Sequence, residues 1–369
     1  MKMRTKNFIF LLALVILFSL LLIILGPGNS SNITNIQNIA NQQFKQIKEN
    51  LRAEKEKELD VDPKYLQLLG FTIDATTTRG GSPHLFNVSR QNFSIVSYVQ
   101  AGQLAASILQ LRNLASVLPS ENFLIYDLGL SETDLLTLSA FCNSSTIKCT
   151  ISQHDFTQYP SYLMDDKLHL FRPLIIKHAL SRFKTILFVA NHIRLRGSNK
   201  VFGEIRKKTE EQSHVLSLEI KKLPITSNTH PRMFDYFDSD ADSFLFVRQV
   251  TLDAVYFHQS KFLDDEILLP WIKCVLTPQC IQPIGASSNT NHCKFNKKPQ
   301  YRYSGCHDYD ESAFNVVLGL AFNFNEAKYS VTDNESSLFY KETLDNSIRI
   351  LENRKKNISE TSEHPYSEE

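Results

Sequence analysis

Strand-like and helical segments alternate between residues 93 and 190, and this alternation constrains the fold more than any other feature of the chain. The strand-like segments are Phe93–Val99, Asn122–Gly129, Thr146–Ile151 and Thr185–Ala190. The helical segments between them are Gln103–Leu118, Glu132–Phe141 and Pro173–Phe183. Strands that alternate with helices of this length are typical of a parallel sheet covered by helices. The sequence therefore predicts an α/β fold with a mostly parallel sheet.

An apolar segment near the N-terminus predicts a membrane anchor. Phe8–Leu25 is apolar except for one serine, and Lys2, Arg4 and Lys6 precede it. A helix of this length can cross a hydrocarbon core of about 30 Å, and the positive-inside rule keeps the basic end in the cytoplasm. A cleaved signal peptide is the alternative, but its apolar core is typically about 7–15 residues long. We therefore expect a single-pass type II protein of the Golgi or another secretory-pathway membrane, with its C-terminal domain in the lumen.

The rest of the chain divides by composition. We expect a cytoplasmic tail (1–7), the anchor (8–25), a luminal stem (26–64), a folded luminal domain (65–330) and a partly disordered C-terminal tail (331–369). The stem is polar, which favours a solvated spacer. It also contains Ala40, Phe44, Ile47 and Leu51 at heptad spacing, which leaves a stem-mediated homodimer open. A net charge of +1 with scattered basic residues gives no reason to expect a nucleic-acid partner.

The cysteines and glycosylation sequons fit a secretory route. Cys142, Cys149, Cys274, Cys280, Cys293 and Cys306 all follow the apolar segment, and none has the spacing of a zinc site. Disulfides are therefore expected, with Cys142–Cys149 as the local pair and three connectivities open for the other four cysteines. The N-x-[ST] acceptors are Asn29, Asn32, Asn87, Asn92, Asn143, Asn334 and Asn357.

Ligands of open α/β sheets bind beyond the carboxyl ends of the strands. This rule predicts a binding rim at Gln100–Gln103, Asp127–Gly129 and Ala190–Arg194. Asp127 either contributes to that rim or only forms the turn after its strand. Arg172, about one helix upstream of the third rim segment, either binds phosphate or covers the sheet.

Two further segments carry candidate catalytic residues. His230, in a compact polar turn, is either an acid, a base or sugar ligand, or a structural histidine. Asp308, Asp310 and Glu311 belong to the densest cluster of ionisable groups. Asp308 is expected to cap the following helix, Asp310–Phe322, where the helix dipole favours acidic residues in the first turn. We interpret Asp310 as combining a helix-start role with a role in the site.

Several phrases together resemble an animal family of type II membrane proteins, well represented in nematodes, which is similar to nucleotide-sugar transferases. The phrases are Asn122–Ser131, Phe171–Ile176, Thr229–Tyr236, Pro270–Cys274, Cys280–Gly285 and Cys306–Asn315. The resemblance spans roughly residues 93–322. It implies a GT-A-like (nucleotide-diphospho-sugar transferase) fold and transfer of a sugar to a secretory-pathway acceptor. The family's strand usually ends in an aspartate at the position where this chain has Ala190. The family's aspartate-glutamine pair before the last helix is Asp310-Glu311 here, so the aspartate is kept and the glutamine is not. Arg194 matches the family's pattern.

The end of the strand at Ala190 leaves metal dependence open. GT-A transferases typically hold a divalent ion with two spaced carboxylates, because hard cations prefer charged oxygens. Asn191 and His192 follow Ala190 here, and without a negative charge they should bind Mg²⁺ or Mn²⁺ poorly. The acidic segment Asp235–Asp242 has the D-x-D spacing, but a solvated loop is the favoured interpretation.

Two hypotheses remain. In the first, the protein is a glycosyltransferase that binds a nucleotide-sugar donor and a glycan or glycoprotein acceptor. Asp127, Arg172, Asn191, His192 and Arg194 would then contact the donor, with Asp310 as the general base. In the second, it is a catalytically inactive luminal binding or scaffold glycoprotein of the same fold. Selective binding of one nucleotide sugar would distinguish the first from the second.

Overall fold

The structure is a computed structural model that describes residues 59–71, 91–144, 147–165, 167–287, 293–295, 298–331 and 338–362. All of these residues belong to the unit Glu58–Glu369, the second of two units in the chain. The predicted cytoplasmic tail, the anchor at 8–25 and most of the stem lie outside the described residues. Among the helices of the described ranges, none is long and apolar enough to span a membrane.

The central sheet has six strands within these ranges, in the order β3-β2-β1-β4-β9-β6. They are β1 (Gln91–Gln100), β2 (Phe123–Leu128), β3 (Cys149–Gln153), β4 (Phe183–Val189), β6 (Val215–Ser217) and β9 (Ala254–His258). Strands β1 to β4 pair in parallel, and β9 is antiparallel to both of its neighbours. The prediction of an α/β fold with a mostly parallel sheet is confirmed, although β3 begins later than expected.

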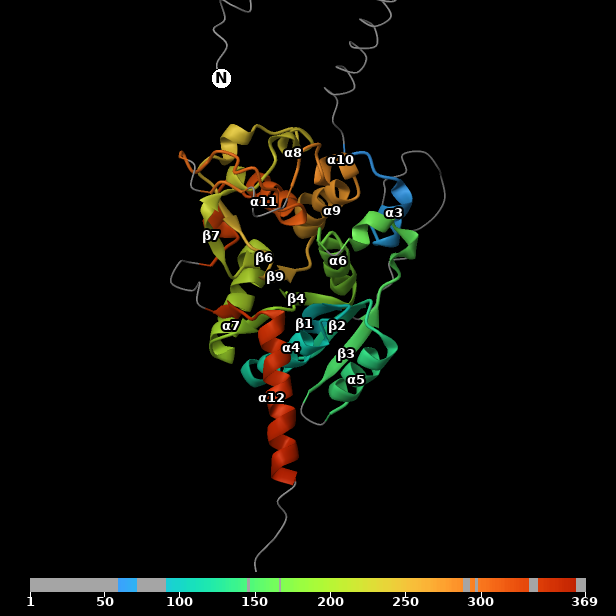
Figure 1. Cartoon of the computed structure of the whole chain (residues 1–369). Coiled ribbons are helices and arrows are strands. Elements are labelled where there is room, and N and C mark those ends of the chain that lie inside the picture. The colour runs from blue at the N-terminus through green and yellow to red at the C-terminus, as the bar shows by residue number, and fades with distance from the viewer. Residues whose placement is uncertain are drawn as a thin grey trace, which may run out of the picture. The chain divides into compact units, whose positions relative to one another are not determined.

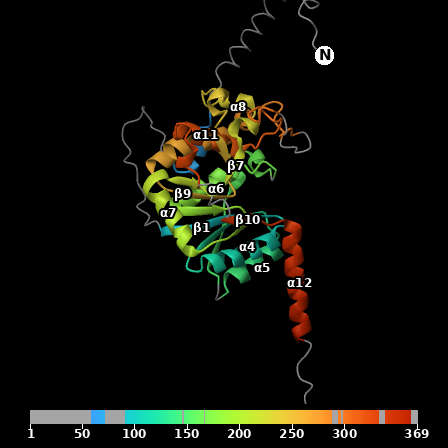
Figure 2. The same cartoon turned by 90° about the vertical axis from the view of Figure 1, so that its left-hand side faces the viewer.

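Helices cover both faces of this sheet (Figures 1 and 2). Helices α4 (Leu104–Val117) and α5 (Glu132–Cys142) lie on one face, and α6 (Arg172–Arg182) lies on the other. Beyond α6, α9 (Leu269–Val275) packs against both α6 and α11 (Asp310–Ala321). The sheet is therefore enclosed on both sides, which explains why seven consecutive residues of β1 are buried.

The remaining α-helices and strands of the described ranges surround this framework. They are α3 (Pro63–Leu68), β5 (Ile193–Leu195), α7 (Asn199–Lys208), β7 (Ile220–Pro224), α8 (Pro231–Asp235), β8 (Arg248–Val250), α10 (Pro278–Ile281), β10 (Phe339–Lys341) and α12 (Leu344–Ser362). Antiparallel pairing joins β7 to β8 and β5 to β10. Strand β10 and helix α12 lie in the segment that the sequence analysis assigned to a C-terminal tail, and β10 brings that segment back to the end of β4.

The hydrophobic core extends over both faces of the sheet, and its part on the α6 face includes side chains of α11. Trp271 and Phe314, from α9 and α11, are fully buried and pack with ring centroids 4.6 Å apart. Phe257 of β9 packs against Phe314 at 6.0 Å. The Trp271 indole N–H donates to the main-chain oxygen of Asp310 (2.9 Å). The core therefore fixes the first turn of α11, which carries the acidic cluster noted in the sequence.

Three disulfides are present among the described residues. Cys142–Cys149 is the predicted local pair and is confirmed. The connectivity left open for the other four cysteines is Cys274–Cys280 and Cys293–Cys306. Two of the glycosylation acceptors, Asn92 and Asn143, have exposed side chains. The other five lie outside the residues whose side chains are described.

Candidate functional site

A pocket of about 300 Å³ lies at the carboxyl ends of β1 and β4. Its wall includes Tyr98 near the end of β1, and His192, which follows β4. The chain passes from β1 through β2 to β3 on one side of β1, whereas β4 pairs with the other side. The strand order therefore reverses between β1 and β4. Such a topological switch point is where open α/β sheets bind their ligands, so the fold alone marks this pocket as the candidate site.

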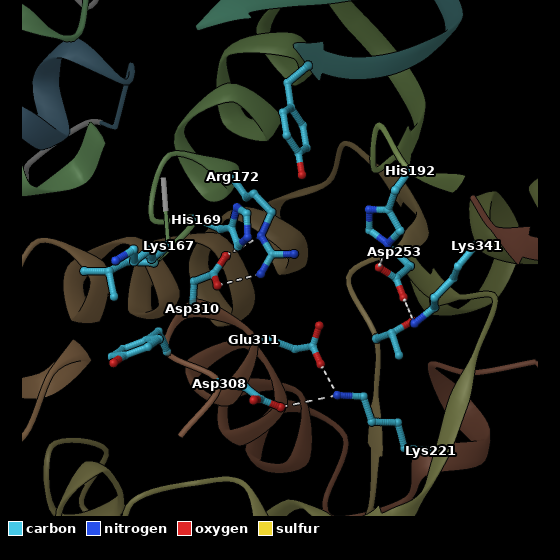
Figure 3. Close-up of a pocket in the computed structure, with 14 residues that line it drawn as sticks. Lys167, His169, Arg172, His192, Lys221, Asp253, Asp308, Asp310, Glu311 and Lys341 are labelled. Atoms are coloured by element: carbon cyan, nitrogen blue, oxygen red, sulfur yellow. Dashed lines mark hydrogen bonds and ion pairs between the residues drawn. The ribbon is translucent and has the colours of Figure 1, made fainter. Parts of the chain in front are cut away.

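The pocket is lined mainly by charged side chains and imidazoles from distant parts of the chain. These residues are Lys167, His169, Arg172, His192, Lys221, Asp253, Asp308, Asp310, Glu311 and Lys341. Figure 3 shows three groupings among them: Arg172 with Asp310, Lys221 with Asp308 and Glu311, and Asp253 with His192 and Lys341. Each carboxylate of the lining therefore lies beside a cation.

The first grouping joins the starts of α6 and α11. Arg172 Nε and Nη2 donate to the two carboxylate oxygens of Asp310, each at 2.6 Å, and both side chains are buried. A bidentate arginine–carboxylate pair has a fixed geometry as well as a strong attraction. Burial raises the pKa of the Asp310 carboxyl to about 6, while Arg172 acts in the opposite direction. Two residues that the sequence analysis selected independently are thus brought into direct contact.

The second grouping corrects an expectation. Asp308 does not cap α11 with its side chain, because the residue at the cap position is Tyr309, whose side chain makes no cap hydrogen bond. The Asp308 carboxylate instead accepts from Lys221 Nζ (3.3 Å), Asn228 and Gln249. Its side chain is therefore drawn toward β7 and β8 rather than toward the helix end.

Lys221 also bonds to Glu311 Oε1 (2.5 Å). Burial tends to lower the pKa of Lys221, but Glu311 and Asp308 outweigh it and raise that pKa, so the ammonium is charged. The other oxygen of Glu311 accepts from the main-chain N–H of Leu252 (3.1 Å). The first turn of α11 thereby holds the chain that leads into β9.

The third grouping lies at the end of β4. The main-chain N–H of Ala190 donates to the main-chain oxygen of Asp253 (2.8 Å), so the two residues are direct neighbours. Asp253 Oδ1 lies 3.2 Å from His192 Nε2, and its Oδ2 lies 2.7 Å from Lys341 Nζ. Burial acts to raise the pKa of Asp253, but His192 and Lys341 outweigh it and hold that pKa well below its usual range. Asp253, the residue directly before β9, therefore stands beside Ala190, the residue directly after β4.

Two buried polar side-chain atoms of the lining have no hydrogen-bond partner in the protein. The hydroxyl of Thr251 is buried, and the residue is 1% exposed. His169 Nδ1 is also buried without a partner, and burial lowers the pKa of that imidazole to about 4. Buried polar atoms are normally hydrogen-bonded, so these two groups are suited to contact a ligand. The charged pairs and these two polar groups together suit a polar, hydroxyl-rich ligand.

Three predicted donor ligands lie outside the pocket lining. Asp127 Oδ1 accepts from the main-chain N–H groups of Gly129 and Leu130, which is the turn-forming alternative. Asn191 bonds through its side chain to Gln103 and Ser107, at the start of α4.

Arg194 is 2% exposed, and its guanidinium donates to the main-chain oxygens of Asn191, Ile193 and Ala106 and to Ser347. Desolvation lowers the pKa of this guanidinium. Its hydrogen bonds join the end of β4 to α4 and α12. Arg172, His192 and Asp310 are thus the predicted site residues that do line the pocket.

His230 also lies outside the pocket lining. It stands at the cap position of α8, where its Nδ1 accepts from the main-chain N–H of Arg232 (3.2 Å). Its own main-chain N–H donates to His307 Nδ1 (3.2 Å). Both contacts are to neighbouring parts of the fold, as expected if His230 is a structural histidine rather than an acid, a base or a sugar ligand.

The main lining residues that the sequence patterns did not indicate are Lys221, Asp253 and Lys341, together with His169 and Thr251. They lie in short strands or loops without strong periodicity, and Lys341 lies in the segment assigned to a tail. The one available signal was a polar residue directly before an apolar strand, at Asp253.

No family model matches this chain, and no curated protein matches it in sequence. Solved structures similar to it include mouse xyloside xylosyltransferase 1 in its apo form (10% identity, 65% of this chain and 84% of that chain, TM-score 0.38). An active-site mutant of LgtC is similar over 51% of this chain and 64% of that chain (11% identity, TM-score 0.33). The mannosyltransferase PcManGT from Pyrobaculum calidifontis, in complex with GDP-Man and Mn²⁺, is similar over 47% of this chain and 46% of that chain (9% identity, TM-score 0.30). The chain thus spans less than two thirds of the last two proteins. All three TM-scores are below 0.5.

Proposed function

We propose that this protein is a glycosyltransferase of the secretory pathway, which transfers a sugar from a nucleotide donor to a glycan or glycoprotein acceptor. The observation that carries the proposal is the charged pocket at the switch point between β1 and β4. The phrases that resemble nucleotide-sugar transferases support it from the sequence. The donor's diphosphate and sugar occupy the pocket, and the acceptor enters from its open side.

The charged groupings fit the demands of glycosyl transfer. Negative charge develops on the departing diphosphate, and preorganised cations stabilise such charge most effectively. Arg172 commits Nε and Nη2 to Asp310 and offers its remaining N–H donors to phosphate. Asp310 accepts the proton of the acceptor hydroxyl, because a carboxyl with a pKa of about 6 is closer to neutral pH than an ordinary aspartate.

Thr251 offers a direct test of ligand binding. Its buried hydroxyl has no protein partner, so Thr251→Val keeps the shape and removes only the group that a ligand would use. Thr229 is the matched control, because it is 0% exposed and its hydroxyl also lacks a partner, but it does not line the pocket. Loss of one hydrogen bond to a neutral group corresponds to about 1 kcal/mol, or roughly fivefold in affinity.

The experiment is a thermal-shift panel of nucleotide sugars on the full-length protein in detergent, with and without Mn²⁺. A ligand that binds only the native state raises the unfolding midpoint. We expect one donor to raise it selectively, with roughly fivefold weaker binding in Thr251→Val and unchanged binding in Thr229→Val. If no donor shifts folded protein, the transferase is wrong and the inactive binding glycoprotein is the better description. Equal effects of the two valine variants would place the ligand elsewhere.

A further inference from the structure

The ammonium of Lys341 lies between two carboxylates at the end of β4. Its Nζ is 2.7 Å from Asp253 Oδ2 and 3.7 Å from Glu219 Oε2. Asp253 and Glu219 are largely buried, with side chains 11% and 28% exposed, whereas Lys341 reaches in from the rim at 53%. Carboxylates on either side of a cation are also a common feature of divalent-metal sites in proteins.

The residues present do not fit a divalent-cation site. Mg²⁺ needs near-octahedral oxygen ligands at about 2.0–2.1 Å, commonly including carboxylates. Among the described residues, no three or more His, Cys, Asp or Glu side chains are grouped so as to hold a metal. Of the carboxylates in the lining, Asp253 is engaged by Lys341 and His192. A metal ion at Asp253 would have to displace the ammonium, because two cations cannot share one carboxylate at that distance without strong repulsion.

Three contacts hold Lys341 in this position. Strand β10 pairs antiparallel with β5, so that Lys341 lies opposite Ile193. The main-chain N–H of Glu342 donates to the main-chain oxygen of His192 (2.8 Å). Arg194 Nη2 donates to Ser347 Oγ (3.3 Å) in the first turn of α12. Arg194 thus acts on the pocket as a positioning residue, by holding the segment that carries Lys341.

We propose that Lys341 takes the place of a divalent metal ion in this pocket, so that the protein binds the donor's diphosphate without metal. This inference rests on the proposed function and specifies how that site handles charge. In the transfer step, the acceptor oxygen bonds to the anomeric carbon of the donor sugar. The bond from that carbon to the diphosphate oxygen breaks, and its electron pair stays on the diphosphate. The acceptor's proton passes to Asp310, and the Lys341 ammonium donates hydrogen bonds to the departing phosphate.

A titration with Mn²⁺ alone tests the inference without any donor. Full-length wild-type protein and Lys341→Ala are titrated with Mn²⁺ and followed by electron paramagnetic resonance. We expect at least tenfold tighter Mn²⁺ binding in Lys341→Ala, because Asp253 and Glu219 then both lose the ammonium that lies beside them. The double variant Lys341→Ala/Asp253→Asn should lose that gain. Lys200→Ala, a lysine on α7 whose side chain is 84% exposed, is the matched control and should behave as the wild type. Wild-type protein that binds Mn²⁺ as tightly as Lys341→Ala, and loses it in Asp253→Asn, would overturn the inference.

Binding of UDP and GDP in the presence of EDTA provides the second arm. A charge-assisted hydrogen bond contributes enough that its loss weakens binding about 10- to 100-fold. We expect this loss in Lys341→Ala, partial rescue in Lys341→Arg, and no effect of EDTA on the wild type. Nucleotide binding that needs Mn²⁺ contradicts the inference but leaves the proposed function standing. Absence of nucleotide binding in folded protein contradicts the proposed function. The Mn²⁺ titration then still decides whether Lys341 occupies the place of a divalent metal ion.

Discussion

Arg172 and Asp310 are 138 residues apart in the sequence and form a bidentate ion pair in the wall of the pocket. Their side chains are only 9% and 1% exposed. Arg172 is the first residue of α6, and Asp310 is the first residue of α11. The pair therefore fixes the two helix starts relative to each other, and it places a guanidinium and a carboxylate at the carboxyl end of the sheet.

Breaking this pair should destabilise the protein strongly. Asp310→Asn leaves the buried Arg172 guanidinium without a countercharge, and removal of one partner from a buried pair costs about 3–5 kcal/mol. Arg172→Met should cost a similar amount, whereas the double variant should cost clearly less than the sum. Urea unfolding of the four proteins measures these values. Glu211→Gln breaks an exposed helical pair and should change stability by no more than about 0.5 kcal/mol. Additive effects in the double variant would show that the two side chains do not interact as described.

Asn315 should stabilise the chain that leads to Asp253. Its Oδ1 accepts from the main-chain N–H of Val250, and its Nδ2 donates to the oxygens of Val250 and Glu311. Asn315→Leu leaves these buried main-chain groups unpaired, so we expect a loss of at least about 2 kcal/mol in urea unfolding. Asn199→Leu, at an exposed position of α7, should stay within about 0.5 kcal/mol of the wild type. A cost in Asn315→Leu as small as in this control would contradict the prediction.

His307 should make stability depend on pH between about 4 and 6.5. Its Nε2 bonds to the main-chain oxygen of Ile281, and its Nδ1 accepts from the main-chain N–H of His230, so the imidazole is neutral in the fold. Burial lowers its pKa from 6.5 to about 4. Between these values the unfolded state binds more protons, so the free energy of unfolding rises with pH and falls on acidification. The full loss for this histidine is about 3 kcal/mol.

The measurement is urea unfolding at several pH values for the wild type and for His307→Gln, which cannot titrate in this range. The variant should be less stable at neutral pH but should lose less stability on acidification. Asp310 titrates in the opposite sense, because burial raises its pKa to about 6, so the difference between the two proteins is the informative quantity. Identical pH slopes in both proteins would show that His307 is not held neutral.

Gly319 should not tolerate a methyl group. A Cβ at this position of α11 would lie 2.5 Å from Cε1 of Phe244, a ring that is 0% exposed. Overpacking of a core costs about 1–3 kcal/mol, which exceeds the gain of about 1 kcal/mol from replacing a helical glycine by alanine. Gly203→Ala, in α7 with nothing within 4 Å, should instead stabilise the protein by about 0.5–1 kcal/mol. Thermal unfolding should therefore shift in opposite directions for the two variants, and equal shifts would contradict the packing described here.

The sequence predicted the elements whose composition is periodic and apolar. Strands β1, β2 and β4 and helices α4, α5, α6 and α11 all lie where the pattern indicated them, because their burial imposes that pattern. The short elements were missed: β10 has only three residues, and its pairing with β5 carries no periodic signal. The same reason explains why Lys341 was not recognised as a lining residue.

The sequence by itself determined the class of fold and the local disulfide, and it selected Arg172, His192 and Asp310, which line the candidate pocket. These follow from interactions between near neighbours or from the rule that parallel strands present their ends at one edge. Only the tertiary structure decided that Asp253, directly before β9, stands beside Ala190 and that Lys341 reaches Asp253 from the C-terminal segment. Contacts between antiparallel neighbours of different sequence regions depend on which strands pair. Which strands pair depends on packing across the whole sheet, so the pairing cannot be predicted from the sequence of any one segment.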